Sequence, residues 1–370
     1  MIHKMIPLAK PYIGNEEIRN VIETMKSGQL SLGPKISKFE EKFSELIGTK
    51  YAVAVNSGTS GLHLCMKAIN LKDGDEVITS PFSFIASSNC ILFEGGKPIF
   101  VDVDEETFNM DPSKIEEVIT LKTKAILVVH IFGQACDMDS IIKIANKHNL
   151  IIIEDSCESI LSKYKDKKVG TFGKASVFAF YPNKQMTTAE GGMIVTNDEK
   201  IYKLCKSLRN QGRSDDVNWL HHDKLGFNYR MSDIHAAIGL SQLEKLDYMI
   251  KKRVEIANMY NKSLSKIKNI KLPYVPKYNK HTWFVYTIRI SDKFSRDCVI
   301  ELLRKKGISS KAYFDTPIHL QPFYKAFGYK KGDFPIAEKI ADSIIAIPFF
   351  VELKDDEIIY ICDTLREILK

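Results

Sequence analysis

The apolar positions of this chain fall into two patterns that predict a succession of strands and helices. Short, mostly apolar runs predict strands, and they cover residues 51–55, 76–79, 97–103, 124–130, 150–153 and 193–196. The runs at 124–130 and 150–153 are continuously apolar, which is typical of parallel strands buried on both faces. Between the runs, apolar residues recur at helical spacing. This alternation indicates an α/β fold with a mostly parallel sheet.

Two helices are predicted ahead of the first strand. Asn15 can cap the first helix, and the second opens at Pro34 and ends at Gly48. We expect the extended arm before them, residues 7–12, to pack on another element. The spacing predicts that one side of the first helix is apolar and consists of Ile18, Val21, Ile22 and Met25.

Near residue 250 the pattern changes to a mixed α/β region. We therefore predict a large domain over residues 1–250 and a smaller one over residues 251–370. Ser232 can cap a long helix before the boundary. Beyond it, residues 284–290 alternate like a half-buried strand, and residues 295–306 read as an amphipathic helix.

Composition narrows the class of protein. The chain has 370 residues, of which 44% are hydrophobic and 27% charged, as in ordinary globular proteins. Its net charge of +7 comes from scattered lysines without a basic stripe or a nucleic-acid motif, so no nucleic-acid partner is expected. No apolar stretch is long enough to span a bilayer and no signal peptide opens the chain, so we expect a cytoplasmic protein without a membrane partner.

Metal and disulfide chemistry have no support in the sequence. The seven cysteines are scattered and form no CxxC pair, which argues against a zinc site and against a disulfide framework. The pair His221 and His222 has no third ligand at a clear spacing. We therefore predict no metal.

Lys184 is the first candidate for chemistry, because it lies in the otherwise uncharged segment 178–189, just before Glu190 and a glycine pair. A partly desolvated lysine is a good nucleophile and can form a Schiff base with an aldehyde cofactor. A lysine on a surface loop explains the same local pattern equally well. The segment alone leaves both interpretations open.

Three further segments could surround such a lysine. Residues 56–61 place small hydroxyl and glycine residues between a strand and a helix, which suits a phosphate, although a plain capped turn looks the same. Residues 154–158 put carboxylates at the carboxyl end of a buried strand, where open α/β sheets bind ligands. Phe82 and Phe84 follow another strand and could stack on a flat ring or pack in the core.

Taken together and in this order, the motifs resemble the DegT/DnrJ/EryC1/StrS family of pyridoxal-phosphate-dependent nucleotide-sugar aminotransferases. The resemblance runs through residues 7–350, and with it the Schiff-base interpretation of Lys184 outweighs that of a surface lysine. It implies the aspartate aminotransferase fold (fold type I). The matching segments are Asn56-Ser57-Gly58-Thr59, Pro81-Phe82-Ser83-Phe84, Glu154-Asp155-Ser156-Cys157-Glu158, Tyr181-Pro182-Asn183-Lys184, Glu190-Gly191-Gly192 and Gly226-Phe227-Asn228-Tyr229-Arg230-Met231.

The resemblance assigns a role to each residue around pyridoxal 5'-phosphate. Lys184 holds the aldehyde and moves a proton, and Asp155 pairs with the pyridine nitrogen to preserve the ring as an electron sink. Glu158 stands where the family often has glutamine, near the 3-hydroxyl, and must be protonated or paired to fit there. The remaining cofactor-binding residues implied are Ser57, Gly58 and Thr59 at the phosphate, Phe84 on the ring, and Asn228.

One departure from the family concerns the phosphate. Relatives often read Phe-Ser-Phe where this chain has Ala179 between two phenylalanines, and the serine hydroxyl is a phosphate ligand. Phosphate binding must therefore rest more on Gly58, Thr59 and Asn228. The resemblance also implies a homodimer with shared active sites, in which Asn228 reaches the neighbouring subunit's cofactor.

The predicted function is transfer of an amino group from L-glutamate, giving 2-oxoglutarate, to a nucleotide-diphosphate 4-keto-6-deoxyhexose in amino-sugar and polysaccharide biosynthesis. An enzyme of the same fold with another reaction (a dehydratase, racemase or lyase) is the alternative, and a non-catalytic regulatory relative is a third. The family's sugar dehydratases carry histidine at the lysine position, so Lys184 argues against that branch.

The substrate prediction also rests on the arginines of residues 284–350. Amino-acid transaminases hold an α-carboxylate with a bidentate arginine, but Arg289 lies in a predicted strand and Arg296 and Arg304 on a helix. His319, in the neutral loop 316–322, is instead a candidate for sugar hydroxyls, although it could equally just order that loop. The substrate-binding candidates are His319, Arg230 and Tyr181.

Overall fold

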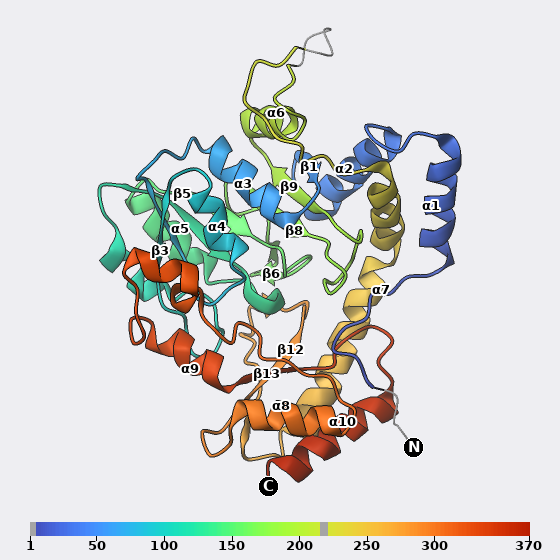
Figure 1. The fold of residues 1–370 in the computed structure, drawn as a ribbon, viewed down its shortest axis with the longest axis vertical. Helices are drawn as coiled ribbons and strands as arrows, with labels where there is room; N and C mark the ends of the chain where they lie inside the picture. The colour runs from blue at the N-terminus through green and yellow to red at the C-terminus, as the bar shows by residue number, and fades with distance from the viewer. Residues whose placement is uncertain (1–4, 215–220) are drawn as a thin grey trace.

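The computed structural model describes residues 5–214 and 221–370, and in these residues a seven-stranded sheet forms the centre of the larger part of the fold (Figure 1). The strand order is β1-β9-β8-β5-β4-β2-β3. Strand β9 is antiparallel to β1 and β8, and the other neighbours pair in parallel. The α/β fold with a mostly parallel sheet is therefore confirmed. The strands are β1 (Tyr51–Val55), β2 (Glu76–Thr79), β3 (Lys97–Phe100), β4 (Thr123–Val129), β5 (Ile151–Asp155), β8 (Ala175–Ala179) and β9 (Gly192–Thr196).

Two apolar cores cover the two faces of this sheet, which explains the continuously apolar runs. Successive side chains of a strand point to opposite faces, so Ile126 and Val128 of β4 join one core while Ala125 and Leu127 join the other. The helices of this part are α1 (Asn15–Ser27), α2 (Pro34–Ile47), α3 (Gly58–Ala68), α4 (Ala86–Leu92), α5 (Met138–Lys147), α6 (Glu199–Leu208) and α7 (Asp233–Leu264).

The C-terminal part has a second sheet and a core of its own. Its strands are β10 (Ile270–Lys271), β12 (Tyr286–Ile290) and β13 (Ile344–Ile347), and its helices are α8 (Arg296–Lys305), α9 (Pro335–Ser343) and α10 (Asp355–Ile368). The N-terminal arm packs here, because Ile6 bridges Ile308 and the Phe349 amide donates to the carbonyl oxygen of Leu8. A third, short sheet contains β6 (Lys163–Tyr164), β7 (Lys167–Lys168) and β11 (Asn279–Lys280).

Helix α7 connects the two parts (Figure 1). It begins at the predicted cap, because the Ser232 hydroxyl accepts from the amide of His235. Its first half contributes Ala236 and Leu246 to a core of the large part, and its second half contributes Ile256 and Tyr260 to the C-terminal core. A boundary at residue 250 stays a prediction, and the helix runs through it.

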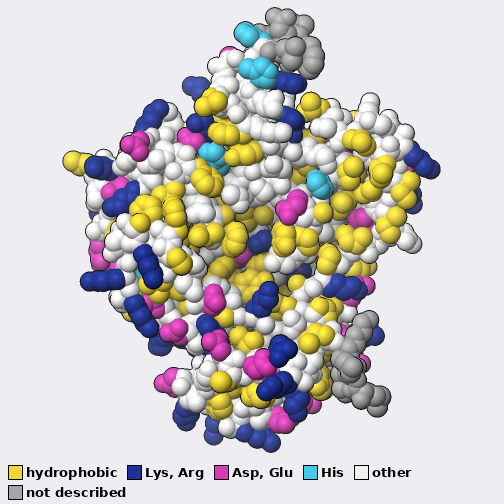
Figure 2. Space-filling model, in the orientation of Figure 1, with side chains coloured by type: hydrophobic (Ala, Val, Ile, Leu, Met, Phe, Trp, Pro, Cys, Tyr) yellow, Lys and Arg dark blue, Asp and Glu magenta, His cyan; other side chains and the backbone are white. Residues whose placement is uncertain are grey.

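Helix α1 differs from the sequence prediction in its cap, and its apolar side faces outward. The cap is Gly14, whose amide donates to Oε2 of Glu17, and Asn15 is the first helical residue. The polar residues Glu17 and Thr24 are buried, while Ile18, Val21, Ile22 and Met25 lie on the outer side, with Ile18 and Met25 more than half exposed. The apolar side chains over α1 are visible in Figure 2.

Hydrogen bonds to α7 explain this orientation of α1. Gln242 donates to Oε1 of Glu17 at 2.8 Å, and Lys245 donates to its Oε2 at 2.7 Å. Asn20 donates to Ser241. The side of α7 that faces α1 is thus polar, and helical spacing in α1 could not reveal that.

Strand β12 is also more buried than predicted. All five of its residues are buried, because it is the middle strand of its sheet and is covered by the C-terminal core. The helix predicted over residues 295–306 is confirmed as α8. Within the described residues, every helix is too short or too polar to cross a lipid bilayer.

Candidate active site

A cleft of about 500 Å³ opens where the central strands end. The last residues of β4, β5 and β8 (Val129, Asp155 and Ala179) line it, because the carboxyl ends of parallel strands meet at one edge of a sheet. The start of α3 closes one side. The structure brings eight of the predicted site residues together here, namely Ser57, Gly58, Thr59, Phe84, Asp155, Glu158, Tyr181 and Lys184.

Lys184 lies in a tight turn after β8, where its amide donates to the carbonyl oxygen of Tyr181 at 2.9 Å. The side chain is only 14% exposed. Its Nζ atom lies 3.2 Å from Oε1 of Glu158 and 4.0 Å from the centre of the Phe284 ring. Lys184 is therefore a largely buried amine held by a carboxylate and an aromatic face, which a surface-loop lysine is not.

Glu158 uses both of its carboxylate oxygens. Oε1 accepts from Lys184, and Oε2 accepts from the backbone amide of Phe132 at 3.0 Å. Burial raises the pKa of Glu158, and the charge of Lys184 partly offsets that effect. Of the two states that the sequence allowed for a glutamate here, the structure has the paired one.

Asp155 is held by two donors at the base of the cleft. Its Oδ2 accepts from the hydroxyl of Ser87 at 2.7 Å, and its Oδ1 accepts from the amide of Cys157 at 3.1 Å. Ser83 extends the chain of hydroxyls, with its Oγ 2.8 Å from that of Ser87. The two bonds fix the direction of the carboxylate.

The adjacent carboxylate, Glu154, points to the opposite face of the sheet, as strand geometry requires. It is fully buried and accepts from His130 and from three backbone amides, those of Gly170, Phe172 and Gly173. Burial by itself raises the pKa of Glu154, but the bond from His130 and the backbone amides bring it below its usual value. Glu154 therefore stabilises the fold and does not line the cleft.

The start of α3 presents backbone donors to the cleft. Ser57 caps the helix by accepting from the amide of Ser60, and the first amides of a helix have no partner within it. A Cβ at Gly58 would lie 2.8 Å from Cβ of Ala179, so only glycine lets the helix start so close to the end of β8. Ala179 itself lines the cleft without a hydroxyl.

Asn228 and Arg230 do not line this cleft. Their segment runs beside the end of β1, where Arg230 bridges Val55 and the backbone carbonyl of Asn228 accepts from Asn56 at 3.4 Å. The guanidinium of Arg230 donates to Oδ1 of Asn210 at 3.0 Å.

His319 is likewise not brought to the cleft, and here the sequence prediction needs correction. The side chain is fully buried, and its Nε2 lies 3.0 Å from Oε1 of Glu338. A buried imidazole bound to a carboxylate has no open path to a sugar hydroxyl. His319 orders its loop, the alternative that the sequence left open, and we withdraw it as a sugar ligand.

Several lining residues were not found from the sequence. Ser87 lies in the first turn of α4 and Ser83 in the loop that precedes it, and no helical spacing links the two in the sequence. Asn183 donates to the hydroxyl of Tyr313 at 3.5 Å, and its buried Oδ1 has no partner in the described part of the chain. The lining residues of the C-terminal part are Phe284, Tyr313 and Phe314, and no local pattern places them here.

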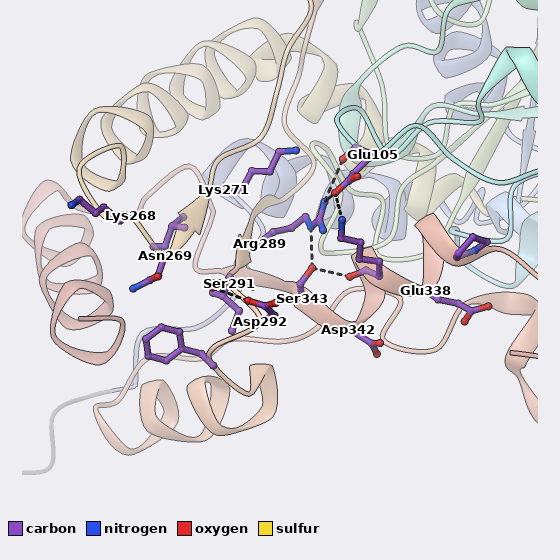
Figure 3. Close-up of a pocket in the computed structure, with 15 residues that line it drawn as sticks. Glu105, Lys268, Asn269, Lys271, Arg289, Ser291, Asp292, Glu338, Asp342 and Ser343 are labelled. Carbon is purple, nitrogen blue, oxygen red and sulfur yellow. Dashed lines mark hydrogen bonds and ion pairs between the residues drawn. The ribbon is translucent and has the colours of Figure 1, made fainter. Parts of the chain in front are cut away.

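A second cleft, of about 680 Å³, lies between the C-terminal sheet and α9 (Figure 3). Arg289 lies at its base and donates to Ser343 at 2.9 Å and to Glu105 at 3.1 Å. Lys339 binds the same carboxylate at 2.9 Å, and Lys339 and Arg289 together lower the pKa of Glu105. Arg289 is therefore committed to an ion pair outside the first cleft. No cluster of three or more potential metal ligands occurs among the residues that the structure describes.

Comparisons with known proteins agree on one family. Residues 11–366 match the model of the DegT/DnrJ/EryC1/StrS aminotransferase family. GDP-perosamine synthase of Escherichia coli O157:H7 is 42% identical to the chain over 98% of each protein. PseC of Helicobacter pylori, an aminotransferase involved in the biosynthesis of pseudoaminic acid, superposes with a TM-score of 0.94 at 31% identity over 99% of each chain. The PLP form of the putative sugar aminotransferase Spr1654 of Streptococcus pneumoniae also superposes with a TM-score of 0.94, at 28% identity over 98% of each chain.

Proposed function

The chain belongs to the DegT/DnrJ/EryC1/StrS aminotransferase family and is a pyridoxal-phosphate-dependent transaminase, and from this premise we propose that it moves an amino group from L-glutamate to a nucleotide-linked keto-sugar. The observation that carries the proposal is the 42% identity, over 98% of both proteins, to an enzyme named for a nucleotide-sugar product. We further propose a 4-keto-6-deoxyhexose as the acceptor and amino-sugar and polysaccharide biosynthesis as the setting.

The donors and acceptors of the cleft fit pyridoxal phosphate. The cleft has the size of a small-molecule site, and it combines a largely buried amine, a fixed carboxylate and the amino end of a helix. Helix α3 has eleven residues, and its amino end suits a phosphate because the free amides of the first turn point outward. Phe84 is 61% exposed at the rim, which leaves a large aromatic face available for a planar ring.

We assign the residues to the cofactor on this basis. Lys184 would hold it through its aldehyde, Asp155 would bind the pyridine nitrogen, and Phe84 would cover the ring. Glu158 would approach the 3-hydroxyl while it keeps its bond to Lys184. The phosphate would bind Ser57, Gly58 and Thr59.

When bound, the cofactor supplies an aldehyde that captures an amine and a ring that accepts electrons. The chain's own residues supply the rest. Lys184 carries a proton at Nζ to and from the carbon that bears the amine. Glu158 keeps that Nζ aimed into the cleft, and the two donors on Asp155 keep its carboxylate directed at the place that the ring nitrogen would take.

The charge of the cleft supports a homodimer with shared sites. Its lining in the described residues contains the carboxylates of Asp155, Glu158 and Glu190 but only one cation, Lys184. Glutamate, a nucleotide diphosphate and the cofactor phosphate are all anions, and the single lysine is used by the cofactor. We therefore propose that a second copy contributes cations and amides, with Arg230 and Asn228 as the residues.

A surface beside the cleft supports the same proposal. Ile18 and Ile22 of α1 line an apolar groove together with Ile13, which precedes the helix, and with Pro182 and Ala189 from the segment around Lys184. Contiguous apolar surface of this kind is typical of protein–protein contacts. A second copy on this side would cover the groove and lie next to Tyr181, which is half exposed and is our candidate for the sugar.

The function is tested with the purified holoenzyme, L-glutamate and a panel of 3-keto and 4-keto nucleotide sugars. We expect 2-oxoglutarate to form in excess over the enzyme only with a nucleotide sugar present, because without an acceptor the cofactor takes up a single amino group, and we expect the new amine to appear at C4 by NMR. The Lys184→Ala protein serves as the inactive control. Turnover of free keto acids alone, with every nucleotide sugar refused, would overturn the proposal, while amination at C3 would overturn only the position.

A further inference from the structure

Arg253 is a buried cation whose role the assignments above leave open. It lies on α7, is 3% exposed, and reaches backbone carbonyls on two sides. Nη1 donates to Trp283 at 3.2 Å and to Phe284 at 3.3 Å, and Nη2 donates to the carbonyl oxygen of Lys184 at 3.5 Å. Among the described residues, no carboxylate lies within ion-pair distance of this guanidinium, and its Nε has no hydrogen-bond partner.

Such an arginine is costly for the fold. Burying a charge without a counter-ion is unfavourable, and the groups that offset this cost in the described residues are the backbone carbonyls and the ring of Phe349, whose centre lies 5.4 Å from Cζ of Arg253. Burial lowers the pKa of Arg253 to about 10, so the group still carries its charge at neutral pH. A charge kept at this place and bound to the carbonyl of Lys184 therefore points to a role in holding the main chain of the site.

The backbone that Arg253 binds is strained. Trp283 has φ of 54°, in the left-handed region that a bulky residue rarely adopts. Its amide donates to Nδ1 of His281 at 2.9 Å, and burial lowers the pKa of His281 to about 3, which keeps that ring a neutral acceptor. Gly133 allows the turn, because a Cβ there would lie 2.7 Å from the amide nitrogen of Trp283. Strain held by several neighbours points to a functional site.

The turn at Trp283 sets the position of the next residue, Phe284. The amide of Phe284 donates to Phe132 at 2.8 Å, and Phe132 in turn donates to Glu158. The ring of Phe284 then lies 4.0 Å from Nζ of Lys184. Arg253 thus binds the main chain of the lysine and the main chain of the aromatic residue that faces its amine.

We propose that Arg253 is a positioning residue for Lys184, and that its guanidinium sets the separation of the lysine amine and the Phe284 ring by holding both main chains. This inference rests on the proposed role of Lys184 as the amine that binds the cofactor. The role explains why a charged residue occupies this position. The planar guanidinium of Arg253 binds three backbone carbonyls that an apolar side chain would leave without a donor.

The test compares Arg253→Lys with a matched control, Arg296→Lys. Arg296 also donates to a backbone carbonyl, that of Ala341, but on α8 and with Asp297 as its ion partner. For each protein we measure Tm without cofactor, the rise in Tm when pyridoxal phosphate is added, and the rate of cofactor release. We expect Arg253→Lys to reduce the cofactor-induced rise and to lower kcat by roughly 10- to 100-fold with an unchanged KM for the sugar.

The control separates positioning from packing. Arg296→Lys is expected to change Tm equally with and without cofactor and to leave its release rate and kcat unchanged. If Arg253→Lys behaves in the same way as Arg296→Lys, the inference is overturned.

Two more variants keep the test decisive. If Arg253→Lys does not fold, the same measurements are made on Phe284→Leu, which removes the aromatic ring and keeps Arg253. A cofactor release rate and a kcat equal to those of the wild type in Phe284→Leu would overturn the inference. Lys184→Ala separates the two proposals. If its cofactor release and turnover match those of the wild type, the assigned role of Lys184 has failed, whatever Arg253 does.

Discussion

The amine of Lys184 and the carboxylate of Glu158 face each other at 3.2 Å, although 25 residues separate them in the chain. They meet because β5 and β8 pair in parallel, so the segments that follow both strands leave the sheet at the same edge. The pair couples the proposed cofactor-binding amine to a group whose pKa burial raises. The protonation state of Glu158 is therefore linked to the stability of the fold.

For Glu158→Gln we expect a pH-dependent gain in Tm of the apoprotein relative to the wild type. A carboxyl whose pKa is raised in the folded state stabilises the fold fully below its unfolded value, near 4.5, and loses that contribution as pH rises through the folded pKa. Glutamine does not titrate, so the Glu158→Gln protein does not lose this contribution to stability as the pH rises. Thermal unfolding between pH 4 and pH 9 measures the difference, with Glu45→Gln at an exposed position as the control. A difference that stays constant, or that favours the wild type at high pH, would contradict the prediction.

For Lys184→Ala we expect no turnover, because no other amine lies in the cleft lining that the structure describes. Borohydride reduction of the wild-type holoenzyme should add the mass of the cofactor to the peptide that contains Lys184. Lys203→Ala, at an exposed ion pair with Glu199, should behave like the wild type. Full activity of the alanine variant, with the cofactor attached to another lysine, would refute the assignment.

Asp155→Asn should mainly reduce activity and Glu154→Gln should mainly reduce stability, because the two side chains point to opposite faces of β5. We expect Asp155→Asn to lower kcat by roughly 100-fold or more with little change in Tm, since the loss is electrostatic. The amide oxygen can still accept from the Cys157 amide while its NH2 group donates to the hydroxyl of Ser87. Glu154→Gln should cost about 1–3 kcal/mol of stability, because a buried hydrogen-bond network loses its charge. Enzyme kinetics and thermal unfolding of both variants test this. A near-native rate for Asp155→Asn would make that residue structural.

The fold could be predicted wherever local pattern and environment agree. The strand over residues 51–55 matches the prediction to the residue, because a largely buried strand of this kind is apolar throughout. The strand over residues 76–79 also matches, although only Val77 and Ile78 in it are apolar. Helix α1 shows where pattern fails. Its spacing identifies an apolar side, but which side is buried depends on Lys245, 228 residues away from Glu17.

The residues of the site also fall into two groups, those that the sequence could place and those that it could not. Lys184, Asp155 and the Ser57–Thr59 segment follow strand ends and match family motifs, so the sequence could place them at one edge of the sheet. Tyr313 and Arg253 reach the site through tertiary packing alone, and neither belongs to a local motif. His319 was misjudged for the same reason, because its partner Glu338 lies on another helix, α9.

The shared site predicts activity from two inactive variants. We expect heterodimers of Lys184→Ala and Asn228→Ala subunits, isolated by two different tags, to recover about half of the wild-type rate, because one of their two sites would contain both native residues. The matched control pairs Lys184→Ala with Asp155→Asn. Those two residues line the same cleft of one subunit, so neither site of that heterodimer is complete and no recovery is expected. We expect Asn228 to act in the neighbouring subunit's site because its segment lies beside β1, outside its own cleft. A Lys184/Asn228 heterodimer no more active than the control, or a fully active monomer in sedimentation, would refute the shared site.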